Sequence, residues 1–345
     1  SASDFYLNPL PIYSLSEGKM IKKKSSATQK IPSPAILFKI TMSSGIDLIV
    51  TKDHEMLVSK DNGYEMVEAQ NLRNSDYLVR SYKYPESSND LVISDLLDDY
   101  YLIDQSDIKE RCKNAFIKKY GSIRSMYRNL KIDRKAFLSG SKFAITLRHL
   151  KLAGIYPTVK KEISSFKTQK GSLISMKKLN TDFFYLLGLI ASDGNNSKEK
   201  KTSRFTRIKF DNNNEALVDT FLEKYEKLFP NIPISKKKLT PKLFRLDTSN
   251  SFFATIAASL GIKSPQKDSC LSAILNVNPS LIKSFIKGFF DGDGSAYYQK
   301  KNPKKGQYSS ISLHTASLGD ARILHKMLLK IQIPNKCIKK HNKRR

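Results

Sequence analysis

The sequence has little cysteine, few acidic residues and no long hydrophobic run. Its three cysteines, Cys112, Cys270 and Cys337, are an odd number without metal-binding spacing, which argues against a disulfide framework and favours a reducing compartment. The longest apolar run, Phe183 to Ala191, is too short to span a bilayer, and no signal peptide is recognisable at the start. We therefore expect an intracellular protein of the cytoplasm or nucleus, with no membrane partner.

Acidic residues are outnumbered almost two to one. The 345 residues include 60 Lys and Arg against 32 Asp and Glu, so the formal net charge is +28 and the pI is about 9.8. This excess indicates a polyanionic partner, and we expect double-stranded DNA. The length allows two or three domains.

One apolar phrase occurs twice, as LLGLIASDG at 186–194 and as IKGFFDGDG at 286–294. Each copy predicts a helix with an internal glycine, Gly188 or Gly288, although glycine costs a helix about 1 kcal/mol relative to alanine. Close contact between two helices explains such glycines. Gly194 and Gly294 are predicted to cap the helices in the left-handed conformation.

If the two helices pack together, Asp193 and Asp293 meet at one end of the pair. Two close carboxylates repel each other unless divalent cations lie between them. Hard oxygen ligands suit Mg²⁺, which keeps several waters and can bind a phosphate. A single apolar helix ending in Asp-Gly is usually plain core, whereas the matched pair favours a metal site.

The doublet resembles the LAGLIDADG motif of homing endonucleases. This resemblance implies two pseudo-symmetric α-β-β-α-β-β-α repeats in one monomeric chain, which form a DNA-binding saddle with the motif helices at the interface. It implies that Asp193 and Asp293 bind two or more Mg²⁺ ions and cut both DNA strands across the minor groove, leaving 3′ overhangs. Ala191 stands where the family often has an earlier aspartate.

Basic segments follow each copy of the motif. In SRFTRIKF, Arg207 and Lys209 alternate with Ile208 and Phe210, which predicts a strand with one wet face. Such a β-ribbon can enter the major groove, although lysine-rich strands are also ordinary soluble edges. The residues predicted to bind DNA are Lys198, Lys200, Lys201, Arg204, Arg207, Lys209, Lys300, Lys301, Lys304, Lys305, Arg134 and Lys135.

The sequence predicts the elements of the first repeat as far as its last helix. Helices are predicted at 215–229 and at 251–260, the latter capped by Gly261, with two strands between them; a further helix is predicted at 318–331. The second repeat has room for one strand after residue 333. Lys237 and either Lys336 or Lys339 are candidates for an assisting basic catalytic residue, from their place on or near the third strand of each repeat.

The N-terminal region has short β-rich segments separated by turns. Its Thr51-Lys52-Asp53-His54 sequence resembles the Thr-x-x-His block of the Hint domain of inteins. That resemblance nominates Thr51 and His54 for splicing chemistry, with Ser1 as a nucleophile that needs activation. The C-terminal Hint strands are not recognisable, so the chain is either an intein lacking that part or an endonuclease with a degenerate Hint remnant.

A basic helical stretch lies between these regions. Helices are predicted at 106–120 and 122–130, followed by a turn at 131–132 and another helix from Asp133. This pattern fits a helix-turn-helix, and a plain three-helix linker fits about as well.

We therefore predict an α+β protein with four parts. They are an incomplete Hint-like β region at 1–84, a helical insert at 85–175, one LAGLIDADG repeat at 176–265 and a truncated second repeat at 276–345. The predicted activity is a sequence-specific, Mg²⁺-dependent double-strand DNA endonuclease that is associated with an intein. An RNA maturase, a DNA-binding regulator and a protein-splicing element with an inactive nuclease remain alternatives.

Overall fold

The computed structural model describes residues 4–6, 11–16, 19–25, 28–30, 36–43, 47–61, 63–79, 91–130, 145–168, 171–198, 204–264, 270–302, 306–335 and 337. The chain divides into two compact units. One comprises residues 1–87 with 321–345, and the other comprises residues 88–320.

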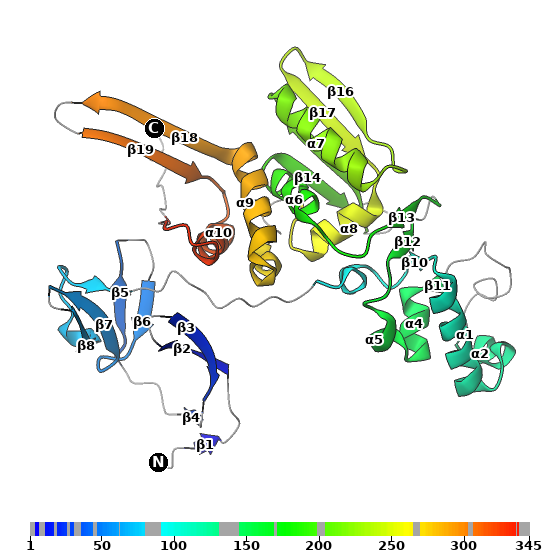
Figure 1. Ribbon diagram of the computed structural model, residues 1–345, viewed down its shortest axis with the longest axis horizontal. Helices are drawn as coiled ribbons and strands as arrows, with labels where there is room; N and C mark the ends of the chain where they lie inside the picture. Colours follow the sequence, from blue (N-terminus) through cyan, green and yellow to red (C-terminus); the bar gives the residue numbers. More distant parts are fainter. Residues whose placement is uncertain are drawn as a thin grey trace. The chain divides into compact units, whose positions relative to one another are not determined.

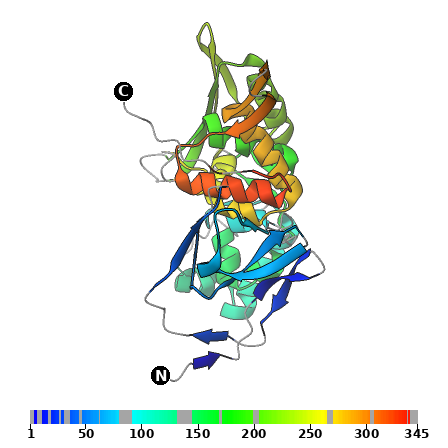
Figure 2. The same ribbon diagram turned by 90° about the vertical axis from the view of Figure 1, so that its left-hand side faces the viewer.

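The first unit is rich in short antiparallel strands, as the sequence predicts. Figure 2 shows these strands, drawn in blue, as several small sheets. β2 (Pro11–Ser16) pairs with β3 (Lys19–Lys24), and β1 (Asp4–Tyr6) pairs with β4 (Thr28–Lys30). β5 (Phe38–Thr41) and β6 (Asp47–Val50) form a hairpin, and β7 (Glu55–Lys60) lies between β8 (Gly63–Glu68) and β9 (Tyr77–Leu78).

The second unit begins with a helical segment that carries a small sheet. The predicted helix at 106–120 is confirmed as α1 (Ser106–Tyr120), and the next is α2 (Ile123–Leu130). After them come α4 (Leu147–Ala153) and α5 (Tyr156–Val159). The strands β10 (Leu102–Ile103), β11 (Ile145–Thr146), β12 (Ser165–Lys167) and β13 (Leu173–Ser175) pair in the order β11-β10-β12-β13. The helix predicted from Asp133 lies outside the described residues.

Residues 181–259 have the predicted element order α-β-β-α-β-β-α. The elements are α6 (Thr181–Asp193), β14 (Gly194–Lys198), β15 (Phe205–Asn212), α7 (Glu215–Leu228), β16 (Ser235–Thr240), β17 (Leu243–Thr248) and α8 (Ser251–Ser259). The strands form an antiparallel sheet in the order β14-β15-β17-β16. Ile208, Phe210, Phe244 and Leu246 are buried on one face of this sheet, so the alternate residues are left on the other face.

The second half begins with the same element order, α-β-β-α. A 3-10 turn at Leu271–Asn276 leads into α9 (Pro279–Asp293), then β18 (Gly294–Asn302), β19 (Gly306–Leu313) and α10 (Leu318–Lys330). β18 and β19 pair in antiparallel fashion. After α10 the described residues contain no further strand, so the second half has fewer described elements than the first.

Helices α6 and α9 lie side by side (Figure 1) and pack against each other. Their internal glycines lie at the contact. A Cβ atom on Gly188 would lie 2.2 Å from the Phe285 carbonyl oxygen, and one on Gly288 would lie 2.1 Å from the Tyr185 carbonyl oxygen. These distances are far below van der Waals contact. The predicted close contact between the motif helices is therefore confirmed.

The left-handed glycine caps predicted from the sequence are found at Gly261 but not at Gly194 and Gly294. Gly194 and Gly294 do not adopt the left-handed conformation, because their φ angles are −97° and −80° and each begins a strand. A side chain there is excluded by crowding instead: a Cβ would lie 2.6 Å from the Ile190 oxygen at Gly194 and 2.3 Å from the Phe290 oxygen at Gly294. Gly261 has a φ of +95° after α8, as predicted.

Neither a disulfide nor a membrane-spanning helix is found among the described residues. Cys112, Cys270 and Cys337 are all free thiols. Among the described helices, none combines the length and the apolar character needed to cross a membrane.

Candidate active site

The packing of α6 against α9 places the two motif aspartates at the same end of the helix pair. A Cβ on Gly292, the residue before Asp293, would lie 3.2 Å from Oδ2 of Asp193, so the first carboxylate lies against the end of the second helix. Asn212, at the end of β15, donates from Nδ2 to the same Oδ2 at 2.8 Å. The first carboxylate is thus held between its own repeat and the other motif.

Burial and like charge shift both carboxyl groups in the same direction. Partial burial raises the pKa of Asp193, the negative charge of Asp293 raises it further, and the Asn212 hydrogen bond partly offsets both effects. Burial also raises the pKa of Asp293, and the nearby His314 partly offsets this rise. A cation between the two groups would relieve this unfavourable charge.

A hollow of about 300 Å³ opens beside Asp193. Its remaining lining comes from the exposed face of the sheet and consists of Gly194, Asn195, Ser197, Lys209, Asp211 and Arg245. The wall therefore places the Asp193 carboxylate beside the Lys209 ammonium group and beside the ion pair of Arg245 and Asp211. Such a combination can accept a phosphate group that approaches the carboxylates.

The donor set fits a hydrated hard cation. Within the described ranges, no group of three or more His, Cys, Asp and Glu side chains converges as a metal site. Two carboxylates with waters and substrate phosphate oxygens are the ligands that Mg²⁺ commonly uses. Asp193 and Asp293 would hold such an ion, which accords with their mutual repulsion.

The surroundings of the two aspartates differ. Near Asp293, the Ser312 hydroxyl lies 3.0 Å from Nε2 of His314 and 2.7 Å from the Ser295 hydroxyl. Strand pairing matches Ser295 with Ser312, as it matches Asn195 with Lys209 in the first half. His314 thus occupies the place that Asp211 has in the first half. The sequence analysis missed His314, Asn212, Asp211 and Arg245, because only strand register brings them to the motifs.

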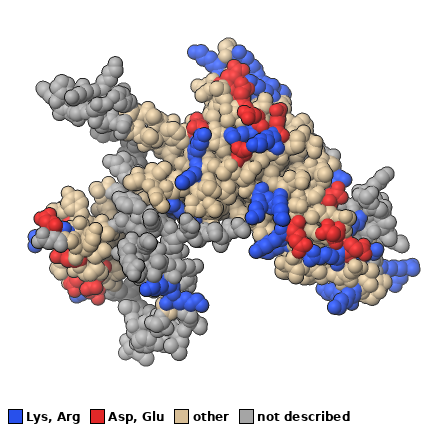
Figure 3. Space-filling model, viewed as in Figure 1, with Lys and Arg blue, Asp and Glu red and all other residues tan. Residues whose placement is uncertain are grey.

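The exposed face of the sheet carries paired charges. Arg207 lies on this face as predicted, and it forms an ion pair with Asp247, while Arg245 pairs with Asp211 at 2.5 Å. Lys209 lies between the two pairs, opposite Asp247. Figure 3 shows basic side chains gathered along the edge formed by β16, where Lys236, Lys237 and Lys238 are exposed.

The other predicted basic residues fall in three groups. Lys237 lies on the edge strand opposite Arg245 and does not line the hollow. The lysine that lines the hollow is Lys209. Lys198 ends β14, and Lys300 and Lys301 lie in β18. The candidates that lie outside the described residues are Lys200, Lys201, Lys304, Lys305, Arg134, Lys135, Lys336 and Lys339.

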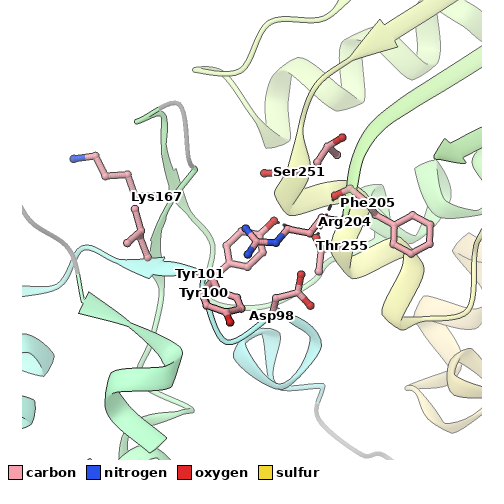
Figure 4. Close-up of a pocket in the computed structure, with 10 residues that line it drawn as sticks. Asp98, Tyr100, Tyr101, Lys167, Arg204, Phe205, Ser251 and Thr255 are labelled. Carbon is pink, nitrogen blue, oxygen red and sulfur yellow. Dashed lines mark hydrogen bonds between the residues drawn. The ribbon is translucent and has the colours of Figure 1, made fainter. Parts of the chain in front are cut away.

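A second hollow lies between the helical segment and the first repeat (Figure 4). The Arg204 guanidinium lies 4.7 Å from the centre of the Tyr100 ring, and the Tyr101 hydroxyl lies 3.2 Å from the Thr255 hydroxyl. Phe252 of α8 packs against Tyr101 and Phe166. The helical segment is therefore joined to the first repeat by an aromatic contact.

The predicted splicing residues lie in the first unit. Thr51 is partly buried and His54 is exposed in the turn between β6 and β7. The His54 amide donates to the Thr51 carbonyl at 3.2 Å, and the Thr51 hydroxyl helps to lower the pKa of Asp53. Ser1 lies outside the described residues.

Comparison with known families adds an independent observation. Residues 280–345 match the LAGLIDADG-like domain family. This range contains Asp293 and all of α9 except its first residue, and it covers a fifth of the chain. Residues 280–345 are thus LAGLIDADG-like by family match, and they contain the second copy of the motif from residue 286 on.

Two curated proteins match along most of the chain. An A-type ATP synthase subunit from Methanopyrus kandleri is 23% identical over 323 residues, which is 90% of this chain and 30% of that protein. The reverse gyrase of Methanocaldococcus jannaschii is 24% identical over 310 residues, or 84% of this chain and 18% of that protein. The chain therefore spans less than a third of the length of either relative.

The homing endonuclease I-DmoI is among the solved structures that match. One of its structures is 18% identical, covers 43% of this chain and 75% of its own, and has a TM-score of 0.29. A complex of I-DmoI with DNA and Mn is 19% identical, covers 43% and 77%, and has the same TM-score of 0.29.

Proposed function

We propose that this chain is a LAGLIDADG homing endonuclease that makes a sequence-specific double-strand break in DNA. The observation that carries the proposal is the meeting of Asp193 and Asp293 at one end of the glycine-packed helices α6 and α9. A regulator that only binds DNA has no need for two repelling carboxylates at a helix interface. The LAGLIDADG-like match over residues 280–345 supports the same activity.

The chemistry follows from the groups around the two carboxylates. A divalent cation, which we propose to be Mg²⁺, would supply an activated water and stabilise the leaving oxygen. Asp193 and Asp293 would hold it, with Asn212 orienting the first carboxylate. Lys209 in the adjacent hollow would hold the backbone of one strand, and His314 would face the other.

The overall charge and the sheet support duplex DNA as the substrate. A net charge of +28 provides a sequence-independent attraction to phosphates. The exposed face formed by β14, β15, β17 and β16 is antiparallel and polar, as a groove-binding sheet must be. We propose that two such halves, related by the α6 and α9 pair in a monomer, form the DNA-binding saddle, with cuts across the minor groove that leave 3′ overhangs.

We further propose that the chain is intein-encoded, with residues 1–84 as the splicing part. An ATP synthase component and a reverse gyrase are different proteins by name, yet each aligns with this chain over more than 300 residues. A segment shared by proteins of different activity is what an inserted element produces. Thr51 and His54 are then the residues proposed to act at the splice junction.

Cleavage of duplex DNA from a randomised library tests the proposal. We expect cuts in Mg²⁺ and none in EDTA, and we expect Asp193→Asn and Asp293→Asn each to lower the cleavage rate by about a hundredfold or more while binding persists. Full-rate cleavage by either variant would contradict the role of the carboxylates. Preferential binding of structured RNA over every duplex would instead favour a maturase.

A further inference from the structure

The exposed face of the first sheet carries two arginines with the same geometry. Arg207 donates from Nε to Oδ1 of Asp247 at 2.7 Å, with Nη2 directed to the second carboxylate oxygen. Arg245 donates from Nε to Oδ1 of Asp211 at 2.7 Å and from Nη2 to Oδ2 at 2.5 Å. Each carboxylate thus takes the Nε side of a guanidinium.

We propose that Arg207 and Arg245 each read one guanine in the major groove, and that Asp247 and Asp211 hold them in the reading orientation. This inference rests on the proposed DNA-binding function. Within the described part of the chain, neither arginine has a further acceptor for its Nη1 hydrogens. The free end of a guanidinium is the part that matches the O6 and N7 acceptors of guanine.

The paired acids favour a base over a phosphate as the ligand. A carboxylate bound to the guanidinium cancels its net charge and would repel a phosphate that approached the same group. The guanine edge is neutral, so its hydrogen bonds to the guanidinium do not depend on a net charge of the arginine. A fixed orientation also lowers the entropy that the long side chain loses on binding.

The arginines are held in place by strand register. Arg245 lies directly opposite Asp211, whereas Asp247 lies opposite Lys209, so Arg207 reaches its partner diagonally. The side chain of Asp247 is only 12% exposed, and its position is therefore restricted by the sheet. Such pairs are worth little as surface ion pairs, about 0–1 kcal/mol, which leaves stability a weak reason for their presence.

The register also predicts the spacing of the two guanines. Arg207 and Asp211 are four residues apart on β15, or about 13 Å, and the diagonal reach of Arg207 shortens the distance between the two guanidinium groups. At about 3.4 Å per base pair, the guanines should be two to four base pairs apart. Because Arg245 lines the hollow beside Asp193, its guanine should be the one nearer to the cut.

Binding selection on a randomised duplex library in EDTA tests this inference with the full chain. We expect the wild type to select two guanines two to four base pairs apart in one half-site. Arg207→Lys and Asp247→Asn should weaken the preference at the outer guanine, and Arg245→Lys and Asp211→Asn at the inner one, by about ten- to a hundredfold. Lys227→Ala, a charge loss on α7 at a residue that is 72% exposed, is the matched control and should keep both preferences.

Three results would overturn the inference. One is a uniform loss of affinity for all sequences in the arginine variants, which indicates phosphate contacts. Another is selection of cytosine with sensitivity to the aspartates alone, which indicates that the carboxylates read the base. The third is unchanged preference in all four variants. A wild type that selects no sequence overturns the proposed function as well, which separates the two failures.

Discussion

At the scale of the residue, the pair Asp193 and Asp293 opposes the stability of the metal-free protein. The pKa of each carboxyl is higher in the folded protein than its ordinary value, through burial and, for Asp193, the charge of Asp293. A group whose folded pKa is raised stabilises the fold below its unfolded pKa, and this contribution is lost as the pH rises through the folded pKa. The two carboxylates therefore lower the stability of the metal-free protein at neutral pH, and a bound cation would offset this effect.

Asp193→Asn should separate these two effects. The amide removes the charge but keeps the size and an oxygen that Asn212 can donate to, so the metal-free variant should unfold at a higher temperature than the wild type above the folded pKa. Below the unfolded pKa the two proteins should converge. Thermal unfolding in EDTA across the acidic to neutral range measures this, and a variant less stable than wild type at neutral pH would contradict it.

Substitution of the glycines of α6 and α9 is expected to lower the stability of the fold, whereas Asp193→Asn raises it. Gly188→Ala and Gly288→Ala each place a methyl group about 2 Å from a backbone oxygen of the other helix, so each should destabilise the fold by about 1–3 kcal/mol or more. Gly319→Ala is the matched control, because its Cβ would lie 3.6 Å from the nearest atom, and it should be neutral or stabilising. Denaturant unfolding of the three variants compares them.

The sequence was sufficient to predict this contact but not the conformation of the neighbouring glycines. An internal helical glycine has few explanations, and close packing is the common one. Gly194 and Gly294 have two possible explanations, a left-handed cap or crowding by neighbouring atoms. The sequence alone does not distinguish between these explanations. The structure shows crowding, because both residues continue directly into strands.

At the scale of the element, the two motif helices are not equivalent. The Tyr185 hydroxyl of α6 donates to Oδ2 of Asp291 on α9 at 2.7 Å. The positions related by the repeat are Phe285 and Ala191, which cannot form such a bond. Burial raises the pKa of Tyr185, and the bond to Asp291 raises it further. Asp291 thus has a hydrogen-bond partner in the helix interface, unlike the two aspartates proposed to bind the cation.

Comparing Asp291→Asn with Asp293→Asn therefore distinguishes the motif aspartate that joins the helices from the one that is proposed to bind metal. The amide oxygen can still accept from Tyr185, so we expect cleavage close to the wild-type rate and a stability change within about 1 kcal/mol. Asp293→Asn, two residues away, should lower the cleavage rate by about a hundredfold or more. Equal losses in the two variants would contradict the assignment, and single-turnover cleavage rates in Mg²⁺ decide it.

The elements of the first repeat could be predicted because each has strong local signals. The alternation of Arg207, Ile208, Lys209 and Phe210 defines β15, and the left-handed Gly261 follows α8. The ion pairs of the sheet could not be predicted, because Asp211 and Arg245 are joined only by the register of two strands 34 residues apart. The same holds for His314 and for the packing of Phe252 against Tyr101.

At the scale of the whole molecule, the proposed activities lie in different compact units. Thr51 and His54 belong to the unit of residues 1–87 and 321–345, and the paired aspartates belong to residues 88–320. Sites in different units that share no partner usually behave independently. The two proposed activities, splicing and cleavage, should then be separable by mutation.

The double variant Thr51→Ala, His54→Ala tests this independence. We expect its Mg²⁺-dependent cleavage to stay within about twofold of wild type, because neither side chain contributes to the carboxylate site. In a precursor with flanking segments, the same variant should lose ligation of the flanks, whereas Asp193→Asn should leave it unchanged. Loss of cleavage in a double variant with an unchanged unfolding temperature would mean that the turn between β6 and β7 takes part in the nuclease, because a mere folding defect would lower that temperature too.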